Sequence, residues 1–168
     1  MNYSIRPWVI EDADALATAI NNKKIQDNLR DGLPYPYTVE DALNYINWIL
    51  SAEKGSLYAF AITADDKAIG SIGVFRKENI HSRTAELGYY IAEPYWGKGI
   101  GTKAVRDICS FVFENTDIIR IFAQPFAQNA ASCRVLEKAG FSLEGILRKN
   151  AVKNGVIIDT KIYALIKE

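Results

Sequence analysis

The stretch "ELGYYIAEPYWGKGIGTKA", residues 86–104, decides the fold, because it joins a strand pattern directly to a glycine-rich helix start. Its first half alternates apolar side chains with other ones, which is typical of a β-strand whose two faces differ. Pro94 ends this strand, since it has no N–H to offer to a neighbouring strand. Gly97, Gly99 and Gly101 then occupy alternate positions at the start of a predicted helix.

This glycine-rich helix start predicts an anion site. The first N–H groups of a helix have no partners within the helix and lie at the positive end of its dipole. The glycines remove the Cβ atoms that would hold a phosphate away from those groups, and Lys98 and Lys103 add positive charge. A plain turn needs only one or two glycines. Because the spacing matches neither the P-loop nor the dinucleotide fingerprint, the pattern favours a phosphate-bearing ligand of another kind.

Periodicity and turn residues predict helices and strands on both sides of this stretch, which together form one mixed α/β domain over residues 1–168. Five helices are expected: 13–20, 23–29, one capped by Thr38 with an apolar face of Ala42, Tyr45, Ile46, Ile49 and Leu50, one running from the glycines to about Glu114, and one between Asn129 and Gly140. Seven strands are expected: 3–8, 56–63, 68–75, 84–92, 118–124, 142–151 and 156–166.

Composition excludes several classes of function. The 20 Lys and Arg residues balance 20 Asp and Glu residues, so no net field draws the chain to nucleic acid or to an anionic membrane. No run of about 20 apolar residues is present, and the N-terminus lacks the pattern of a secretory signal. Cys109 and Cys133 fall in apolar helical patterns, which favours buried, reduced thiols. We expect a cytoplasmic protein with no nucleic-acid or membrane partner, as a monomer or homodimer.

Two separated motifs carry a family resemblance. "ELGYYIAEPYWGKGIGTKA" followed by "NAASCRVLEKAGF" resembles the GNAT superfamily of N-acetyltransferases, and in particular the branch of bacterial ribosomal-protein N-terminal acetyltransferases. The resemblance runs nearly end to end and includes the closing "KNGVIIDTKIYAL". It implies a mostly antiparallel twisted sheet of about seven strands, with one splayed parallel pair and flanking helices. It also implies acetyl coenzyme A as acetyl donor and no metal.

The resemblance places the cofactor on specific residues. The family's phosphate loop falls on residues 96–101, where Trp96 replaces the usual Gln or Arg. The backbone around Ile91 is expected to pair with the pantetheine arm, and Arg134, Lys138 and Arg106 are candidates to reach the phosphates. The predicted cofactor-binding residues are Tyr89, Ile91, Ala92, Trp96, Gly97, Lys98, Gly99, Ile100, Gly101, Thr102, Asn129 and Arg134.

Acetyl transfer to an amine needs a neutral amine, a stabilised oxyanion and a proton for the leaving thiolate. Glu86 is the candidate base, with a structural carboxylate as the alternative. Ser132 is the candidate acid for the thiolate, although a serine at that position of a capped helix also bonds backbone, and a tyrosine is an alternative proton donor. A backbone N–H near Ile91 is the expected oxyanion donor. His81, the only histidine, is expected at the surface, and Tyr163 is expected to be structural.

The acceptor is less constrained by the sequence. The "LPYPY" stretch (33–37), Tyr45 and Trp48 put aromatic bulk where the family builds its acceptor groove. The leading hypothesis is therefore an N-acetyltransferase that acts on a protein N-terminal α-amine or on a small-molecule amine such as a polyamine, amino acid or aminoglycoside. Two other hypotheses remain open at this point: a non-catalytic acyl coenzyme A sensor and a dinucleotide-dependent enzyme.

Overall fold

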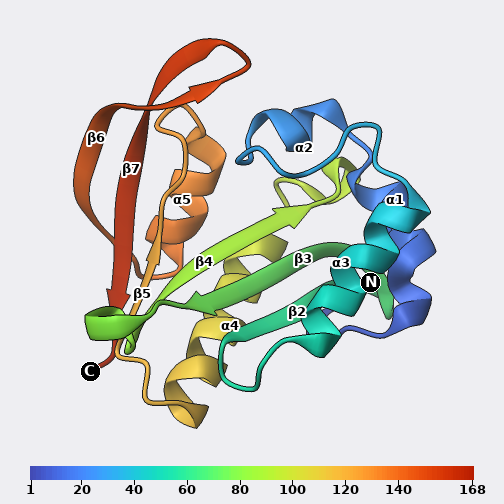
Figure 1. The fold of residues 1–168 in the computed structure, drawn as a ribbon, viewed down its shortest axis with the longest axis horizontal. Coiled ribbons are helices and arrows are strands. Elements are labelled where there is room, and N and C mark those ends of the chain that lie inside the picture. Colours follow the sequence, from blue (N-terminus) through green and yellow to red (C-terminus); the bar gives the residue numbers. More distant parts are fainter.

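A seven-stranded sheet forms the centre of the computed structural model, which describes residues 1–168 (Figure 1). The strand order across the sheet is β1-β2-β3-β4-β5-β7-β6. The strands are β1 (Tyr3–Pro7), β2 (Leu57–Ala64), β3 (Lys67–Arg76), β4 (Thr84–Ile91), β5 (Arg120–Ala123), β6 (Ser142–Lys153) and β7 (Val156–Ile166). Only β4 and β5 run parallel, and every other neighbouring pair is antiparallel. The predicted fold class is confirmed.

Helices cover both faces of the sheet (Figure 1). The helices are α1 (Ala13–Ile20), α2 (Lys23–Asp27), α3 (Val39–Ser51), α4 (Ile100–Asn115) and α5 (Ala130–Lys138). The first three share one hydrophobic core with one face of the sheet, and α4 and α5 share a second core with the other face. None of these helices has the length and apolar character needed to cross a bilayer.

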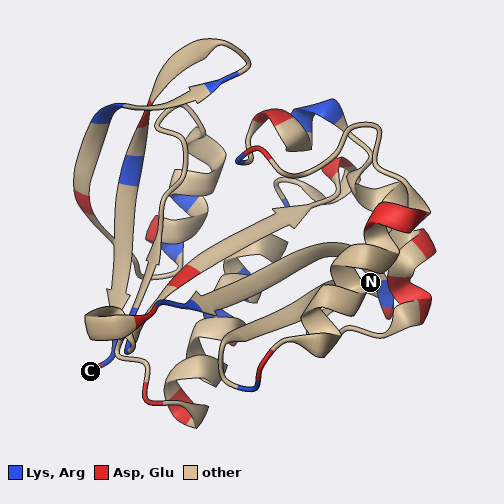
Figure 2. Cartoon of the chain, viewed as in Figure 1, with Lys and Arg blue, Asp and Glu red and all other residues tan.

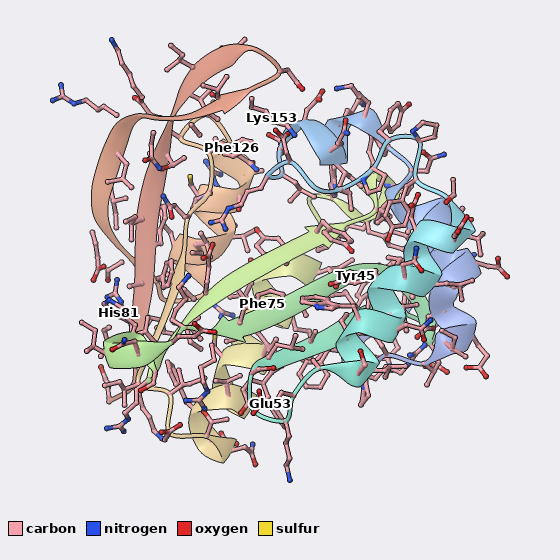
Figure 3. The ribbon with its side chains drawn as sticks, viewed as in Figure 1. Tyr45, Glu53, Phe75, His81, Phe126 and Lys153 are labelled. Atoms are coloured by element: carbon pink, nitrogen blue, oxygen red, sulfur yellow. The ribbon has the colours of Figure 1, made fainter.

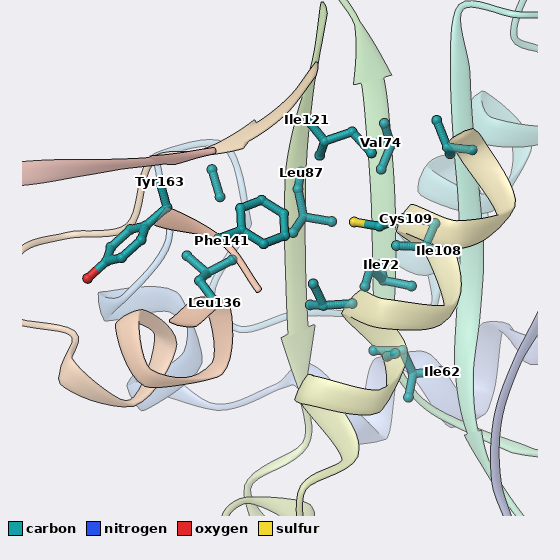
Figure 4. Packing of buried hydrophobic residues seen from close by; sticks show 14 of the residues in the cluster. Ile62, Ile72, Val74, Leu87, Ile108, Cys109, Ile121, Leu136, Phe141 and Tyr163 are labelled. Carbon is teal, nitrogen blue, oxygen red and sulfur yellow. The ribbon is translucent and has the colours of Figure 1, made fainter. Parts of the chain in front are cut away.

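Strand β4 contributes to both cores because its side chains alternate between the two faces. Ala85, Leu87 and Ile91 lie in the core beneath α4, whereas Tyr90 packs against the core of α1 and α3. Figure 4 shows the α4 and α5 side, where Leu87 lies among side chains of neighbouring strands and helices. This alternation matches the pattern read from the sequence.

Local sequence signals set the ends of several elements. Thr38 and Asp41 form the capping box that begins α3. Asp65 and Asp66 make the turn between β2 and β3, both with positive φ, as the two central residues of a tight hairpin require. The predicted apolar face of α3 was wrong at Leu50, which is 56% exposed, because it lies one residue, or about 100° around the helix, beyond the buried Ile49.

The two parallel strands separate soon after they meet. The pairing of β4 with β5 covers only residues Thr84 to Glu86, which face Arg120 to Phe122. β5 is also shorter than predicted, at four residues. From Leu87 to Ile91, β4 therefore has no strand partner on its β5 side, and a wedge opens between the two strands.

Candidate active site

A cavity of about 940 Å³ occupies the wedge between β4 and β5. Its walls come from β3, β4, the start of α4, the end of β5 and α5, together with α2 and the segment that follows it. One end of the cavity meets the glycine-rich start of α4, and the other lies between β3 and the α2 segment. Parts of the chain that are far apart in sequence thus share one site.

The glycine-rich end has the backbone of an anion cradle. Gly97 and Gly99 have φ of 72° and 78°, a left-handed conformation that side-chain-bearing residues rarely adopt. A Cβ added at either position would meet no atom within 4 Å, so both backbones face open space. Gly99 caps α4 at its N-terminus, where the first N–H groups of this helix of 16 residues lack helical partners.

Gly101 differs from the other two glycines. Its φ is ordinary, and a Cβ there would lie 3.4 Å from Ile91 Cδ1 and 3.6 Å from both a Tyr89 ring carbon and Val135 Cγ1. These are ordinary van der Waals distances, so a small side chain would fit at this position. Only Gly97 and Gly99 are therefore required by the backbone conformation of the loop.

Only some of the basic side chains near the glycine-rich loop line the cavity. Lys98, Arg134 and Lys138 line the cavity, and the Lys98 ammonium lies 5.5 Å from the centre of the Tyr95 ring. Lys103 does not line the cavity; it pairs with Asp107 one turn along α4, at 2.6 Å. Arg106 also lies outside, where its guanidinium donates to the Lys138 carbonyl. Of the positive charges expected at the phosphates, three face this end of the cavity.

Trp96 connects the glycine loop to the free edge of β4. Its indole Nε1–H donates to the carbonyl oxygen of Ile91 at 2.6 Å. This bond holds the loop against the strand and occupies one backbone acceptor at the strand end. Ala92 is the one predicted cofactor-binding residue that does not line the cavity: its side chain is buried, and its N–H donates to Ile69 O at 2.8 Å.

A short chain of hydrogen bonds joins the start of α5 to β4. The side-chain oxygen of Asn129 accepts from the Ser132 N–H at 3.2 Å, which caps α5. The Ser132 hydroxyl lies 3.1 Å from the Tyr89 hydroxyl, and all three side chains line the cavity. Burial raises the pKa of Tyr89 to about 12, although the bond with Ser132 acts in the opposite direction. Tyr89 therefore keeps its proton at neutral pH.

Glu86 lies where β4 and β5 begin to separate. Its side chain is 17% exposed, and one carboxylate oxygen forms an ion pair with Arg30 of the segment after α2. The other oxygen lies 3.9 Å from the Lys77 ammonium. All three residues line the cavity, so the candidate base belongs to a small ionic cluster and not to an isolated carboxylate.

Aromatic side chains lie beside this ionic cluster, beginning with Phe75, which pairs with Glu86 across β3 and β4. The Tyr45 hydroxyl and Ser71 Oγ are 2.8 Å apart, and the Phe75 ring stacks on Trp48 with a centroid distance of 6.2 Å. In Figure 3, Tyr45 and Phe75 lie close together between α3 and β3. The Tyr90 hydroxyl, which is buried, has no hydrogen-bond partner. This end thus offers rings and one free hydroxyl.

The tip of the β6–β7 hairpin lies beside α2 and the segment that follows it (Figure 3). The buried Lys153 donates to Asp31 at 2.9 Å, and the Asn154 side chain donates to Asp27 at 3.0 Å. Two elements more than 120 residues apart in sequence are therefore joined beside Arg30. We call these two contacts the clasp.

Two other predicted positions lie away from the cavity. His81 is exposed on a short turn before β4, as expected (Figure 3). Tyr163 is buried in the core and donates its hydroxyl proton to Glu137 at 2.8 Å, which is a structural role. No group of three His, Cys, Asp or Glu side chains is arranged to hold a metal ion.

The sequence matches a known family over most of its length. Residues 3–142 fit the model of the acetyltransferase (GNAT) domain. The chain belongs to the GNAT family. The acetyltransferase is 39% identical over 133 residues to the probable N-acetyltransferase YjcK of Bacillus subtilis (strain 168), a match that covers 77% of this chain and 74% of that relative. It is 29% identical over 118 residues to the ribosomal-protein-serine acetyltransferase of Escherichia coli (strain K12), covering 70% of this chain and 65% of that relative.

A solved structure shares the fold of the acetyltransferase. RimL, a ribosomal L7/L12 α-N-protein acetyltransferase solved in complex with coenzyme A, superposes with a TM-score of 0.88 at 23% identity, over 99% of this chain and 95% of that one. The family confirms acetyl coenzyme A as co-substrate, and the cavity fits this group. The open backbone at Gly97 and Gly99, beside three basic side chains, suits a diphosphate.

The sequence therefore identified most residues at the glycine-rich end of the cavity but missed two that contact Glu86. Except for Ala92, all predicted site residues line the one cavity. Arg30 and Lys77 were not predicted, although both contact Glu86. Neither belongs to a motif, and each approaches Glu86 from a different element. The sheet pairing that aligns Glu86 with Phe75, two residues before Lys77, could have indicated Lys77, but no sequence signal places Arg30 near Glu86.

Proposed function

We propose that this acetyltransferase moves the acetyl group of acetyl coenzyme A directly to the α-amine of a protein N-terminus, in a complex that holds both substrates. One observation carries the proposal: a single cavity has the phosphate cradle at one end, Glu86 and an aromatic wall at the other, and a free strand edge between them. The named functions of two relatives, a ribosomal-protein-serine and a ribosomal L7/L12 α-N-protein acetyltransferase, support a protein acceptor. A small-molecule amine is the second candidate acceptor.

The donor would bind along the residues predicted for it. The N–H groups at the start of α4 hold the diphosphate, with Gly97 and Gly99 as its floor and Lys98 and Arg134 as its counter-charges. The pantetheine arm follows the edge of β4 that β5 leaves unpaired, and it thereby takes the place of a strand. Trp96 holds the loop to the end of that strand through the Ile91 carbonyl.

Direct transfer is favoured over an acetyl-cysteine intermediate. Cys109 and Cys133 are both buried, and neither lines the cavity. Burial raises the pKa of the Cys109 thiol to about 12, which disfavours the thiolate that a nucleophile requires. The amine itself is therefore the group that attacks the thioester carbonyl.

Three groups would assist the chemistry. Glu86 accepts a proton from the incoming ammonium, directly or through water, and leaves the neutral amine that attacks. A backbone N–H near Ile91 donates to the oxyanion that forms on the thioester carbonyl. Ser132, oriented by the Tyr89 hydroxyl, donates to the leaving thiolate of coenzyme A. Because Tyr89 stays protonated, it can supply the hydrogen bond that orients Ser132.

Release of the coenzyme A thiol tests this function. Purified protein would be mixed with acetyl coenzyme A and matched peptides: one with a free N-terminus and no lysine, and one with a blocked N-terminus and an internal lysine. We expect thiol release with the free N-terminus and at least tenfold less with the internal lysine. Intersecting initial-velocity lines are expected for a complex of both substrates, whereas parallel lines would contradict direct transfer.

A further inference from the structure

The acceptor end of the cavity carries an excess of positive charge. Besides the three at the phosphate cradle, four basic side chains line the cavity: Lys24, Arg30, Arg76 and Lys77, of which Arg30 and Lys77 contact Glu86. Glu86 is the only acidic side chain that lines the cavity at all. Figure 2 shows acidic segments at the starts of α1 and α3, and also on α2 and the loop after it, where Asp27 and Asp31 contact the hairpin tip instead of lining the cavity.

Two of the four basic side chains are already neutralised by carboxylates outside the cavity. Lys24 forms an ion pair with Glu93, and the Arg76 guanidinium lies 2.9 Å from an Asp117 oxygen. Arg30 and Lys77 form no ion pair with a carboxylate outside the cavity, and both contact Glu86 instead. One carboxylate thus faces two cations at the place where the acceptor amine must arrive.

Arg30 is held at this place by its neighbour in the chain. Asp31 accepts the hydrogen bond of Lys153 in the clasp, which ties this segment to the β6–β7 hairpin. The Arg30 side chain remains 65% exposed, so solvent and solutes can reach the guanidinium. A guanidinium presents paired donors that match the two oxygens of a carboxylate. The segment that carries Arg30 is therefore tied to the hairpin, while the Arg30 guanidinium stays accessible to an acceptor.

Proton transfer changes the charge balance of this cluster. When Glu86 takes a proton from the ammonium, the acceptor becomes a neutral amine and Glu86 becomes a neutral acid. Arg30 and Lys77 then lose their only counter-charge, and a cation without a partner opposes this step. A carboxylate on the acceptor, placed near its amine, would replace Glu86 as the partner of Arg30. The same carboxylate would free Glu86 to act as base.

We propose that Arg30, assisted by Lys77, is a specificity determinant that selects amine acceptors with a carboxylate near the amine. This inference rests on the proposed function and adds its substrate class. Two sources share the required chemistry: a polypeptide N-terminus with Asp or Glu at its second or third residue, and a free amino acid with its own carboxylate. Polyamines and aminoglycosides, which carry only positive charge, are poor acceptors by this reasoning.

The test compares acceptors that differ only in charge. Three peptides share one N-terminal residue and carry Asp, Asn or Lys at the second position, and the free amino acid of that N-terminal residue and its amide form a second set. The measured quantity is the ratio of kcat/KM for the anionic acceptor to kcat/KM for its neutral match. In the wild-type protein we expect this ratio to be about 10 to 100, the range for a hydrogen bond between charged groups.

Variants assign the ratio to Arg30. Arg30→Ala should reduce the ratio to near one, and Lys77→Ala should reduce it partly, while Lys54→Ala, an exposed lysine far from the cavity, should leave it unchanged. In Arg30→Ala, Glu86 lacks this partner with either acceptor, so the anionic acceptor no longer gains by freeing Glu86 and no longer gains an ion pair. Arg30→Glu should favour the Lys peptide.

Each outcome has one meaning. A wild-type ratio near one, with normal turnover of the neutral peptide, would overturn the inference and leave the proposed function standing. A large ratio that survives Arg30→Ala would also overturn it, because another group would then recognise the anion. Absence of thiol release with every amine would instead refute the proposed function. A high ratio in the amino-acid set alone would identify the free amino acid as the source of the carboxylate.

Discussion

Replacing Gly99 by alanine should impair both stability and donor binding, by separable amounts. Gly99 has φ of 78°, and the left-handed conformation costs a residue with a Cβ about 1–2 kcal/mol. For a chain of this size, about 1 kcal/mol lowers Tm by roughly 2–4 °C, so a decrease of about 2–8 °C is expected. The added methyl group also projects into the open space assigned to the diphosphate. Loss of one or two charge-assisted bonds there should raise the Kd for acetyl coenzyme A about 10- to 100-fold.

A matched glycine separates the two effects. Gly155, in the β6–β7 turn, has φ of 74° and equally open surroundings, but it lies away from the donor end of the cavity. Gly155→Ala should lower Tm by a similar amount and leave the Kd for acetyl coenzyme A unchanged. Thermal unfolding without ligand and calorimetric titration with acetyl coenzyme A measure the two quantities. Equal Kd values for wild type and the Gly99 variant would refute the cradle.

Three further changes test the chemistry and the fold. Glu86→Gln should lower kcat about 10²- to 10⁴-fold with little change in Tm, as measured by thiol release. Ser132→Ala should lower kcat more than it alters KM for acetyl coenzyme A. Because burial raises the pKa of Tyr89 to about 12, the Tyr89–Ser132 hydrogen bond should cause no alkaline fall in kcat below about pH 10. Asp12→Asn should cost about 1–3 kcal/mol at pH 7. Burial acts to raise the pKa of Asp12, but hydrogen bonds led by that from Arg6 hold it below its usual value. The cost should therefore begin to shrink as pH falls below about 4, the usual pKa of Asp, and be lost once pH falls below the depressed pKa of the folded state, as measured by urea unfolding.

Each of these predictions has a control and a contrary outcome. Glu78→Gln, at an exposed position outside the cavity, should leave kcat unchanged, and equal kcat for both glutamine variants would remove Glu86 from the mechanism. Full activity of Ser132→Ala would transfer the role of thiolate partner to another group. For Asp12, a destabilisation that is the same at pH 3 and pH 7 would mean that packing, and not charge, is lost.

Local patterns predicted the elements because local physics forms them. The alternation along residues 84–92, the capping box at Thr38 and the positive-φ turn at Asn154 and Gly155 all depend on neighbours within a few residues. The same holds for Asn129, which caps α5 through the backbone of Ser132. Leu50 failed because periodicity identifies an apolar stripe but not where the tertiary contacts of a helix end.

The parts that sequence patterns missed depend on contacts between distant segments. The wedge exists because β4 and β5 pair over three residues only, and no local pattern in the sequence shows where this pairing ends. The family resemblance supplied the splayed pair instead. Arg30 reaches Glu86 across 56 residues, and Lys153 reaches Asp31 across 122. The motifs also suggested Lys103 as a phosphate partner, but helical geometry turns it to Asp107.

The two ends of the cavity are formed by different parts of the chain, so donor binding and acceptor choice depend on different residues. Almost every group assigned to the donor comes from residues 89–138, whereas the groups around the acceptor come largely from residues 24–45, β3 and the hairpin tip. If the proposed function holds, substitutions in the early helices should change which amine is chosen and leave coenzyme A binding intact. Exchanging residues 24–37 between members of such a family would be an economical way to redirect the enzyme to a new acceptor.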